Sequence, residues 1–427
     1  MLTLNLIREN TDEVIRRLQV KNFDAKSIVN KIVKLDKNRR LLQNKLDNEL
    51  AELKIISNTI GSLLKSNKRD EAEASKLLTG EIKTEIASFT KLLEENETTL
   101  NKLLLKLPNL PHETVPPGKG AEDNLKVGLG GRLKRLHEKA LSHWDLAKEY
   151  DIIDFELGNK ITGAGFPVYK GKGAKLQRAL INFFLEENIR AGYREILPPL
   201  MVNKVSGFGT GQLPDKDAQM YYVKLDDFYL IPTAEVPVTN LYRDVILESK
   251  DLPIKNTAYT PCFRREAGSY GKDVRGLNRL HQFDKVEIVQ IQHPDKSYDT
   301  LDEMKRHVEG LVKKLKLKYR ILMLCGGDMS FTSALTYDFE VYAMAQKRWL
   351  EVSSVSNFES FQANRLKLRF REEGSKKPQL AHTLNGSSLA LPRIVAALME
   401  NYQTADGIRI PSVLWRYTGF KIIERPV

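Results

Sequence analysis

Cysteine and long apolar runs are scarce in this chain. Its 427 residues include two cysteines, Cys262 and Cys325, whose spacing fits neither a metal-binding pair nor a disulfide framework. No stretch approaches the roughly 18 consecutive apolar residues of a membrane-spanning helix, and the opening residues, MLTLNLIRENTDEV, contain acidic side chains before any apolar run develops. These absences predict a chain with no membrane partner and no leader peptide, working in the reducing cytoplasm.

Proline is absent between Met1 and Leu107, and glycine is rare there. Apolar residues in this part recur at alternating steps of three and four, which is the pattern of a coiled coil. One series comprises Ile28, Ile32, Leu35, Leu42, Leu46, Leu53, Ile56, Ile60 and Leu63. A second comprises Leu78, Ile82, Ile86, Phe89, Leu93, Leu100, Leu103 and Leu107. The polar segment KSNKRDEAEA separates them, so the sequence predicts an antiparallel helical hairpin with arms of roughly 55 Å at ~1.5 Å per residue.

The outer faces of this hairpin carry many cations, with acids interspersed. They are Lys31, Lys34, Lys37, Arg40, Lys45, Lys54, Lys65, Lys68 and Arg69. Mixed charge is usually found on a solvated surface, and most pairs of heptad segments form dimers. Contact with RNA is a third interpretation of these faces. The net charge of +12 leaves the choice open, because it suits either solubility or a polyanionic partner.

Proline and glycine then end the helical part. The segment KLPNLPHETVPPGKG predicts a linker, which divides the chain into residues 1–110, a linker at 111–130 and a second domain at 131–427. In that domain, strand-like pieces such as DKVEIVQ alternate with amphipathic helices such as LPRIVAALMENYQ. This pattern predicts an α+β fold with an antiparallel sheet. GxGxxG and Walker motifs are absent, so a doubly wound nucleotide-binding fold has no support.

The densest group of cations lies in FRREAGSYGKDVRGLNRLHQF, residues 263–283. We expect a strand entering at Tyr259, a turn over residues 267–278 and a strand leaving from Gln282. Alternation along the strands then places four side chains around one surface: Arg264, Glu266, Phe283 and Glu287. Arginine binds phosphate as a planar fork, a phenyl ring stacks on a purine, and a carboxylate accepts from amino groups. Any two of these residues would suit a surface salt bridge, but all four together predict a nucleotide-binding surface.

Three longer segments resemble the three motifs of class II aminoacyl-tRNA synthetases, and within that class the chain resembles the seryl-tRNA synthetases. GYREILPPL, with Pro199, resembles the first motif, which lies at a dimer interface. TPCFRREAGSYGKDVRGLNRLHQFDKVE resembles the second, and HTLNGSSLALPRIVAALMENYQ, with Arg393, the third. GTGQLP, IPTAEVPVTNL and DMSFTSALTYDFEVY are similar to segments of serine-specific members. The resemblance implies a class II catalytic domain, an antiparallel β-sheet flanked by helices, preceded by the bacterial-type helical hairpin.

The resemblance also implies an activity: ATP-dependent ligation of L-serine to serine tRNA through a seryl-adenylate, and to selenocysteine tRNA where one is present. Catalysis is implied for Arg264, Arg393 and Glu351. The implied serine-binding residues are Thr233, Ala234, Glu235, Arg264, Glu287, Asn385 and Ser387. The implied ATP-binding residues are Arg264, Arg265, Glu266, Leu280, Phe283, Glu351, Val352, Ser353, Ser354 and Arg393. Mg²⁺, which prefers hard oxygen ligands, is expected at the ATP phosphates on Glu351 and Ser354.

Two further implications concern partners. The chain is expected to form a homodimer through the first motif, and its hairpin to contact the long variable arm of serine tRNA. Leu335 and Ser330 depart from the family pattern, which has lysine and glycine there. One alternative is a synthetase-like binding module, against which the presence of Arg264, Arg393 and Glu351 argues. Another class II specificity would lack the hairpin, and a purely structural coiled-coil protein leaves residues 130–427 unexplained.

Overall fold

The computed structural model describes residues 1–134, 136, 138, 140–215, 218–266 and 275–426. It separates into two compact units, Met1–Gln19 with Phe23–Pro108 and Val20–Asn22 with Asn109–Val427. Within the described ranges, no helix combines the length and the apolar character that crossing a lipid bilayer requires.

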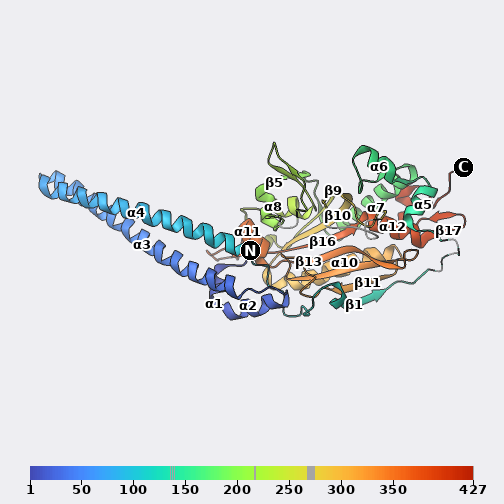
Figure 1. The fold of residues 1–427 in the computed structure, drawn as a ribbon, viewed down its shortest axis with the longest axis horizontal. Coiled ribbons are helices and arrows are strands. Elements are labelled where there is room, and N and C mark those ends of the chain that lie inside the picture. Colours follow the sequence, from blue (N-terminus) through green and yellow to red (C-terminus); the bar gives the residue numbers. More distant parts are fainter. Residues whose placement is uncertain (135, 137, 139, 216–217, 267–274, 427) are drawn as a thin grey trace. The chain divides into compact units, whose positions relative to one another are not determined.

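The first unit consists of helices (Figure 1). Two short ones, α1 (Leu4–Glu9) and α2 (Thr11–Val20), precede α3 (Lys26–Lys65) and α4 (Arg69–Leu104). Helices α3 and α4 lie side by side as an antiparallel pair, which confirms the predicted hairpin. The residues between them, 66–68, form a shorter connection than the polar segment suggested.

The seam between α3 and α4 follows the predicted positions on α3, where Ile32 and Leu46 are buried and the other apolar members of the series are half-buried. On α4 the prediction is wrong at Leu78, which is 42% exposed. The seam passes instead through the half-buried Ser75 and Thr79. An apolar pattern could not locate this part of the seam, because the residues that line it between the buried Ala72 and Ile82 are polar.

One acid, Asp36, is buried within α3, and arginines compensate its charge. The carboxylate accepts from Arg8 at 3.0 Å and from Arg39 at 3.2 Å, and Arg40 lies 3.3 Å away. Burial by itself would raise the pKa of Asp36, but these guanidinium groups hold it below its usual value. Asp36 thereby ties α1 to α3.

The second unit is built on an eight-stranded sheet in the order β1-β11-β12-β13-β16-β10-β9-β4. Its strands are β1 (Leu125–Gly130), β4 (Arg194–Glu195), β9 (Ile254–Phe263), β10 (Gln282–Gln292), β11 (Tyr319–Met323), β12 (Leu335–Ala343), β13 (Arg348–Asn357) and β16 (His382–Ala390). Neighbouring strands are antiparallel, except that β4 runs parallel to β9. The predicted antiparallel sheet is confirmed.

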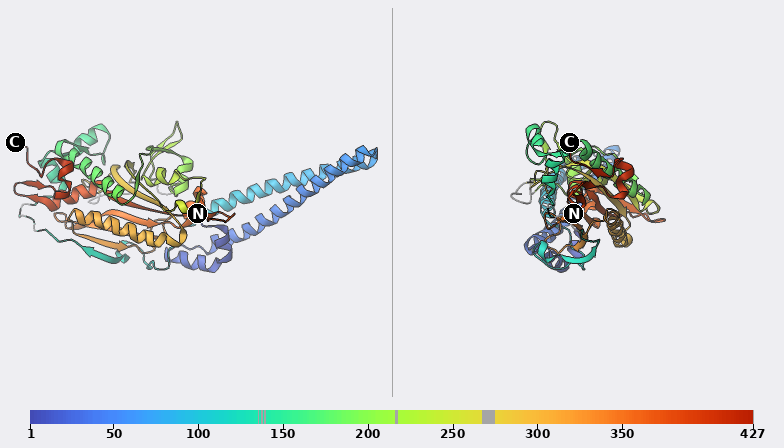
Figure 2. Two further views of the ribbon diagram at one scale, coloured as in Figure 1. Left: turned by 180° about the vertical axis from the view of Figure 1, so that it is seen from behind. Right: turned by 90° about the vertical axis from the view of Figure 1, so that its right-hand side faces the viewer.

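Helices cover both faces of this sheet (Figure 1, Figure 2). Helices α7 (Gly171–Arg190), α10 (Ser297–Lys314) and α12 (Leu391–Tyr402) share the main hydrophobic core with Val286 and Ile288 of β10. Helices α9 (Glu235–Asn240) and α11 (Ser360–Leu366) pack on the other face, against Val289 and Ile291. Because side chains alternate along a strand, the odd-numbered residues of β10 face α9 and α11.

Shorter elements complete the second unit. The helices are α5 (His143–Glu149), α6 (Phe155–Ile161), α8 (Lys204–Thr210) and α13 (Trp415–Thr418). The strands are β2 (Ile153–Asp154), β3 (Val168–Tyr169), β5 (Met201–Asn203), β6 (Tyr222–Val223), β7 (Phe228–Leu230), β8 (Ile246–Glu248), β14 (Arg369–Arg371), β15 (Gln379–Leu380), β17 (Gln403–Thr404), β18 (Gly407–Arg409) and β19 (Ile422–Ile423).

Candidate active site

Strands β9 and β10 form the centre of the candidate site. They pair antiparallel, and Arg264 extends the pairing beyond β9 by donating its N–H across the hairpin at 2.8 Å. Strand β10 begins at Gln282 as predicted, whereas β9 begins at Ile254, ahead of the predicted Tyr259. Residues 267–274 of the predicted turn lie outside the described residues.

Arg264 follows β9 directly, with its guanidinium group beside the ring of Phe283. The central carbon of the guanidinium lies 5.1 Å from the ring centroid, and Nε donates to the Pro232 carbonyl at 3.3 Å. Both side chains are half-buried, so each keeps an accessible part. The structure therefore brings together the residues expected to bind phosphate and to stack on a base.

A buried polar cluster lies where β10 faces α9. Lys285 donates to the Thr233 hydroxyl at 2.7 Å and forms an ion pair with Glu287, and that hydroxyl lies 3.5 Å from the Glu287 carboxylate. The side chains of Lys285 and Glu287 are 7% and 2% exposed. Lys285 was not among the predicted site residues, although its place two residues from both Phe283 and Glu287 puts it on their side of β10.

Glu235, the first residue of α9, adds a second buried carboxylate. Gln362 donates to it at 2.6 Å and is itself oriented by Thr383, whose hydroxyl donates to the Gln362 carbonyl oxygen at 2.7 Å. Burial, and then the negative charge of Glu287, raise the pKa of Glu235 to about 7. Gln362 was missed by sequence reasoning, because it lies 127 residues from Glu235 along the chain.

Strand β16 brings Asn385 and Ser387 to one sheet face beside Glu287. Ser387 lies directly opposite Glu287 in the register of β10 and β16, and both β16 residues are 8% exposed. The Ser387 carbonyl accepts from the Ser353 hydroxyl at 2.6 Å, which keeps that hydroxyl inside the protein. Ala234 is fully buried in a small apolar cluster, so only its backbone could contact a ligand.

Three of the predicted ATP-binding residues are engaged by the protein itself. Arg265 Nε donates to the Met220 carbonyl at 3.1 Å. Glu266 lies beyond β9 with a φ of +50°, so strand alternation does not decide its direction, and it forms an ion pair with Arg279. Leu280 is 4% exposed within the main core, so its side chain is not available to a base.

Glu351 and Ser354 share the accessible face of β13 because of a β-bulge. Residues three apart point to opposite faces of a regular strand. Here the register of β13 against β12 shifts at Val352, and Val352 and Ser353 are both buried while Glu351 is exposed and Ser354 half-buried. Across the described part of the chain, no three acidic, histidine or cysteine side chains form a metal cage of their own.

Asp338 of β12 lies directly opposite Ser354 and adds an oxygen donor that sequence reasoning did not identify. The Ser354 hydroxyl hydrogen-bonds to its carboxylate, and Oδ1 is buried with no hydrogen-bond partner among the described residues. Burial, and then the charge of Glu351, raise the pKa of Asp338. An orphaned carboxylate oxygen beside Glu351 and Ser354 fits a site for a hard cation such as Mg²⁺.

Arg393, near the start of α12, is oriented by two carbonyl groups. Its Nε donates to the Asn278 carbonyl at 3.0 Å and its Nη1 to the Glu351 carbonyl at 2.7 Å, with the Glu351 carboxylate 3.6 Å away. Arg393 thus connects α12 with β13 and with the residues that lead into β10. The structure places it in contact with Glu351, which is expected to bind the Mg²⁺ of ATP.

Comparison with known proteins gives two family matches. Residues 221–402 match the tRNA synthetase class II core domain (G, H, P, S and T), and residues 1–111 match the seryl-tRNA synthetase N-terminal domain. A serine–tRNA ligase from Salinibacter ruber is 49% identical to this chain over 98% of both. The crystal structure of seryl-tRNA synthetase from Pyrococcus horikoshii complexed with ATP matches with a TM-score of 0.92 and 34% identity over 100% of both chains. The structure of M. kandleri SerRS in complex with A. aeolicus tRNASec shares the fold, with a TM-score of 0.58 and 18% identity over 86% of this chain and 72% of that one.

Proposed function

The chain belongs to the seryl-tRNA synthetase family of class II enzymes, the serine–tRNA ligases, and on this basis we propose that it activates L-serine with ATP as a seryl-adenylate. One observation carries the proposal. Arg264 lies beside Phe283 and donates a hydrogen bond to the carbonyl of Pro232. The next residue, Thr233, belongs to the buried cluster with Lys285 and Glu287. A side chain that can bind phosphate and a ring that can stack on a base therefore adjoin a buried polar cluster suited to a small polar substrate.

Serine is held by its three polar groups. Its ammonium is bound by Glu287, Glu235 and the Thr233 hydroxyl, and its carboxylate by Arg264. Its hydroxyl is bound by Asn385 and Ser387 on β16. Alanine would leave these buried polar groups without a partner, at a cost of roughly 1–3 kcal/mol for each, and threonine needs room for a further methyl group.

The chemical step is the attack of a serine carboxylate oxygen on the α-phosphorus of ATP, with pyrophosphate as the leaving group. A carboxylate is already anionic at neutral pH, so the step needs no general base. Arg264 draws the two anions together, Arg393 holds the far phosphates, and Phe283 stacks on the adenine beside Glu266. The protein contributes position and charge neutralisation, as in phosphoryl transfer generally.

The Mg²⁺ that accompanies ATP is held by Glu351 and Ser354, with Asp338 next to them. The β-bulge at Val352 and the orphaned Asp338 oxygen support this assignment. When bound, Mg²⁺ supplies positive charge that offsets the charge of the phosphates. The proposed domain limits are residues 1–110 for tRNA binding, 111–130 for the linker and 131–427 for catalysis.

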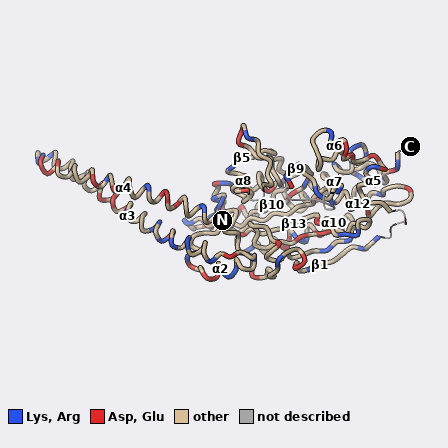
Figure 3. Tube along the Cα trace, viewed as in Figure 1, with Lys and Arg blue, Asp and Glu red and all other residues tan. Residues whose placement is uncertain are grey.

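The hairpin of α3 and α4 binds the long variable arm of serine tRNA, and of selenocysteine tRNA where one is present. Both helices carry mixed charge along their length (Figure 3), and all nine cations of the predicted outer faces are exposed. Duplex RNA is read largely by shape and phosphate spacing, which distributed lysines and arginines suit. The M. kandleri SerRS complex with tRNASec supports this partner class.

A homodimer in the cytoplasm completes the proposal. Strand β4, just ahead of Pro199, is the edge strand of the large sheet, and Leu197 beside it is 86% exposed. An edge strand with an exposed apolar neighbour is a natural pairing surface.

Isolation of the intermediate tests the proposed function. The protein incubated with ATP and radiolabelled serine, without tRNA, should retain the label through gel filtration and transfer it to serine tRNA afterwards. Labelled alanine and threonine are the controls and should be retained at least about a hundredfold less. A protein that retains no serine label, or retains it equally without ATP, contradicts the proposal.

A further inference from the structure

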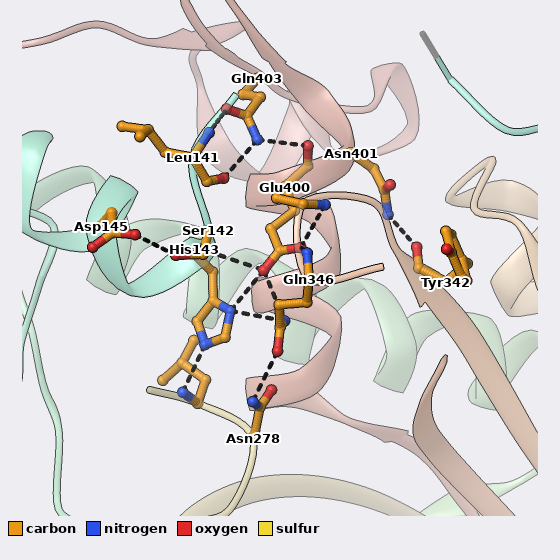
Figure 4. A network of polar contacts seen from close by, with 12 residues as sticks. Leu141, Ser142, His143, Asp145, Asn278, Tyr342, Gln346, Glu400, Asn401 and Gln403 are labelled. Carbon is orange, nitrogen blue, oxygen red and sulfur yellow. Dashed lines mark hydrogen bonds and ion pairs between the residues drawn. The ribbon is translucent and has the colours of Figure 1, made fainter. Parts of the chain in front are cut away.

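Helix α12 carries a fully buried glutamate, Glu400, that the proposed chemistry does not use (Figure 4). Its Oε1 accepts from the backbone N of His143 at 3.1 Å, from His143 Nδ1 at 2.9 Å and from Gln346 Nε2 at 2.7 Å. Its Oε2 accepts from the backbone N of Ala345 and of Gln346, each at 3.1 Å. We call Glu400, His143 and Gln346 the Glu400 cluster. A buried carboxylate with this many donors holds its neighbours in one arrangement.

The other ends of the Glu400 cluster hold two consecutive residues that lead into β10. The Leu277 N–H donates to His143 Nε2 at 2.9 Å, so Nε2 is the unprotonated nitrogen and the proton on Nδ1 is donated to Glu400. Gln346 Oε1 accepts from Asn278 Nδ2 at 2.9 Å. One buried carboxylate therefore orients both side chains that bind Leu277 and Asn278.

The close approach of this segment to His143 requires a glycine. Gly276 has a φ of +67°, and a Cβ at this position would lie 2.3 Å from His143 Nε2. The preceding residue, Arg275, places its guanidinium carbon 4.6 Å from the ring centroid of Trp144. Residues 275–278 therefore each contact the start of α5 or the Glu400 cluster.

Residues 278 and 279 contact two residues of the proposed ATP site, Arg393 and Glu266. The Asn278 carbonyl accepts from Arg393 Nε at 3.0 Å, and Arg279 forms the ion pair with Glu266. A displacement of Asn278 would therefore turn Arg393 and move the Arg279–Glu266 pair at the same time.

We propose that the Glu400 cluster is a positioning device for ATP. It fixes residues 277–279 and through them aims Arg393 and Glu266, without touching the nucleotide. The inference rests on the proposed function, and it specifies that the binding of ATP, and not that of serine, depends on this cluster. The proposed serine ligands are Arg264, Thr233, Glu235 of α9, Glu287 of β10 and two residues of β16. The hydrogen bonds of the Glu400 cluster go to Leu277, Asn278 and Ala345 instead, so the cluster affects ATP selectively.

Two substitutions at His143 separate this role from a merely structural one. His143→Gln keeps an acceptor for the Leu277 N–H in place of Nε2 but loses the donor to Glu400, whereas His143→Asn keeps a donor in place of Nδ1 and loses the acceptor. Positioning predicts that His143→Asn raises the KM for ATP about tenfold, the effect of one lost hydrogen bond, with the KM for serine unchanged. His143→Gln should stay near wild type. If His143 serves only as a hydrogen-bond donor to the buried Glu400, His143→Gln should raise the KM for ATP more than His143→Asn does. That result overturns the proposal.

Asn401→Ala is the matched control. Asn401 is the next residue of α12 and donates to the Tyr342 carbonyl at 2.8 Å, on the side of the helix that does not hold Leu277 or Asn278 (Figure 4). Its loss should lower Tm without changing the KM for ATP. A KM for ATP that simply follows Tm across the three variants contradicts positioning. If neither His143 variant folds, Gln346→Leu removes the Asn278 contact while the backbone donors to Glu400 remain, and it carries the same expectation as His143→Asn.

Hydrogen exchange in the ligand-free protein provides a readout that does not depend on catalysis. The Leu277 amide should exchange about tenfold faster in His143→Asn than in wild type, as a locally released amide does, and at the wild-type rate in His143→Gln. Equal protection in both variants overturns the proposal. A wild-type protein without serine-dependent pyrophosphate exchange defeats the proposed function instead, so the two failures are distinguishable.

Discussion

At the scale of single residues, Glu235 and Glu287 are two buried carboxylates with different surroundings. Glu287 pairs with Lys285 and lies near the Thr233 hydroxyl, so a cation compensates its charge. The direct partner of Glu235 is the neutral amide of Gln362. Its pKa of about 7 follows from burial and from the charge of Glu287, and Glu235 therefore changes charge near neutral pH.

The first prediction is a pH-dependent affinity for serine. Below pH 7 the Glu235 carboxyl of the free protein is mostly protonated, and it must lose that proton to bind an ammonium group. The KM for serine should therefore rise as pH falls from 8 to 6, by up to about tenfold per unit below the pKa, while the KM for ATP stays flat. Glu235→Gln should raise the KM for serine at pH 8 and remove the dependence. A wild-type KM for serine that is constant over this range contradicts the role of Glu235.

The second prediction concerns Arg264, which meets two anions in the transition state. Arg264→Ala should lower kcat about a hundred- to a thousandfold, equivalent to ~3–4 kcal/mol, with a smaller rise in KM. Single-turnover formation of the adenylate measures the effect, and circular dichroism verifies the fold. A variant within about threefold of wild type would exclude the role, since that is less than one hydrogen bond to a charged group contributes.

Sequence patterns identified which types of side chain form the site better than the directions in which these side chains point. The pairing of Arg264 with Phe283 followed from strand alternation. The common face of Glu351 and Ser354 did not, because it depends on a bulge at Val352 that no local pattern marks. Gln362 was missed because it meets Glu235 only through the packing of elements 127 residues apart. Asp338 was missed because its place opposite Ser354 depends on the register of β12 and β13.

At the scale of elements, the hairpin of α3 and α4 depends on its seam. The apolar period predicted both helices and most seam positions, because burial on a helix follows a regular step. It placed Leu78 in the seam wrongly. Leu78 is the neighbour of Thr79, a polar residue of the seam, and its distance along the chain from the other apolar residues also fits the helical period. Leu78 is 42% exposed and Leu100 is 2% exposed, although both belong to the same predicted series.

A matched pair of substitutions tests this difference, and it is the third prediction. Leu100→Ala should destabilise the hairpin by about 2–5 kcal/mol, because it leaves a cavity in the seam. Leu78→Ala should change stability by no more than about 0.5 kcal/mol, as at other surface positions. Hydrogen exchange of the α4 amides measures both. Equal effects at the two positions would place Leu78 in the seam after all.

At the scale of the whole molecule, the proposed function divides the task of recognition between the two units. The second unit contains the residues proposed for serine and ATP, so something else must identify the tRNA. The antiparallel pair of long helices in the first unit has no part in the proposed chemistry. Because the two units are each compact by themselves, removing most of the hairpin should leave the catalytic residues in place.

The fourth prediction follows from that division. Replacing residues 35–98 by a short Gly/Ser loop should leave serine-dependent pyrophosphate exchange nearly unchanged. The same deletion should raise the KM for tRNA sharply and abolish the preference for a long variable arm, and salt should weaken the wild-type interaction strongly. Unaltered charging of serine tRNA by the shortened protein would reduce the hairpin to a stabilising coiled coil.

Pyrophosphate exchange with each of the twenty amino acids tests the central claim most directly. Exchange reports formation of the aminoacyl-adenylate without tRNA, and therefore depends on the proposed serine and ATP sites and not on the hairpin. The proposed pocket predicts strong exchange with serine, and with alanine and threonine at least about a hundredfold less. Absence of exchange with serine, or equal exchange with another amino acid, would contradict the account.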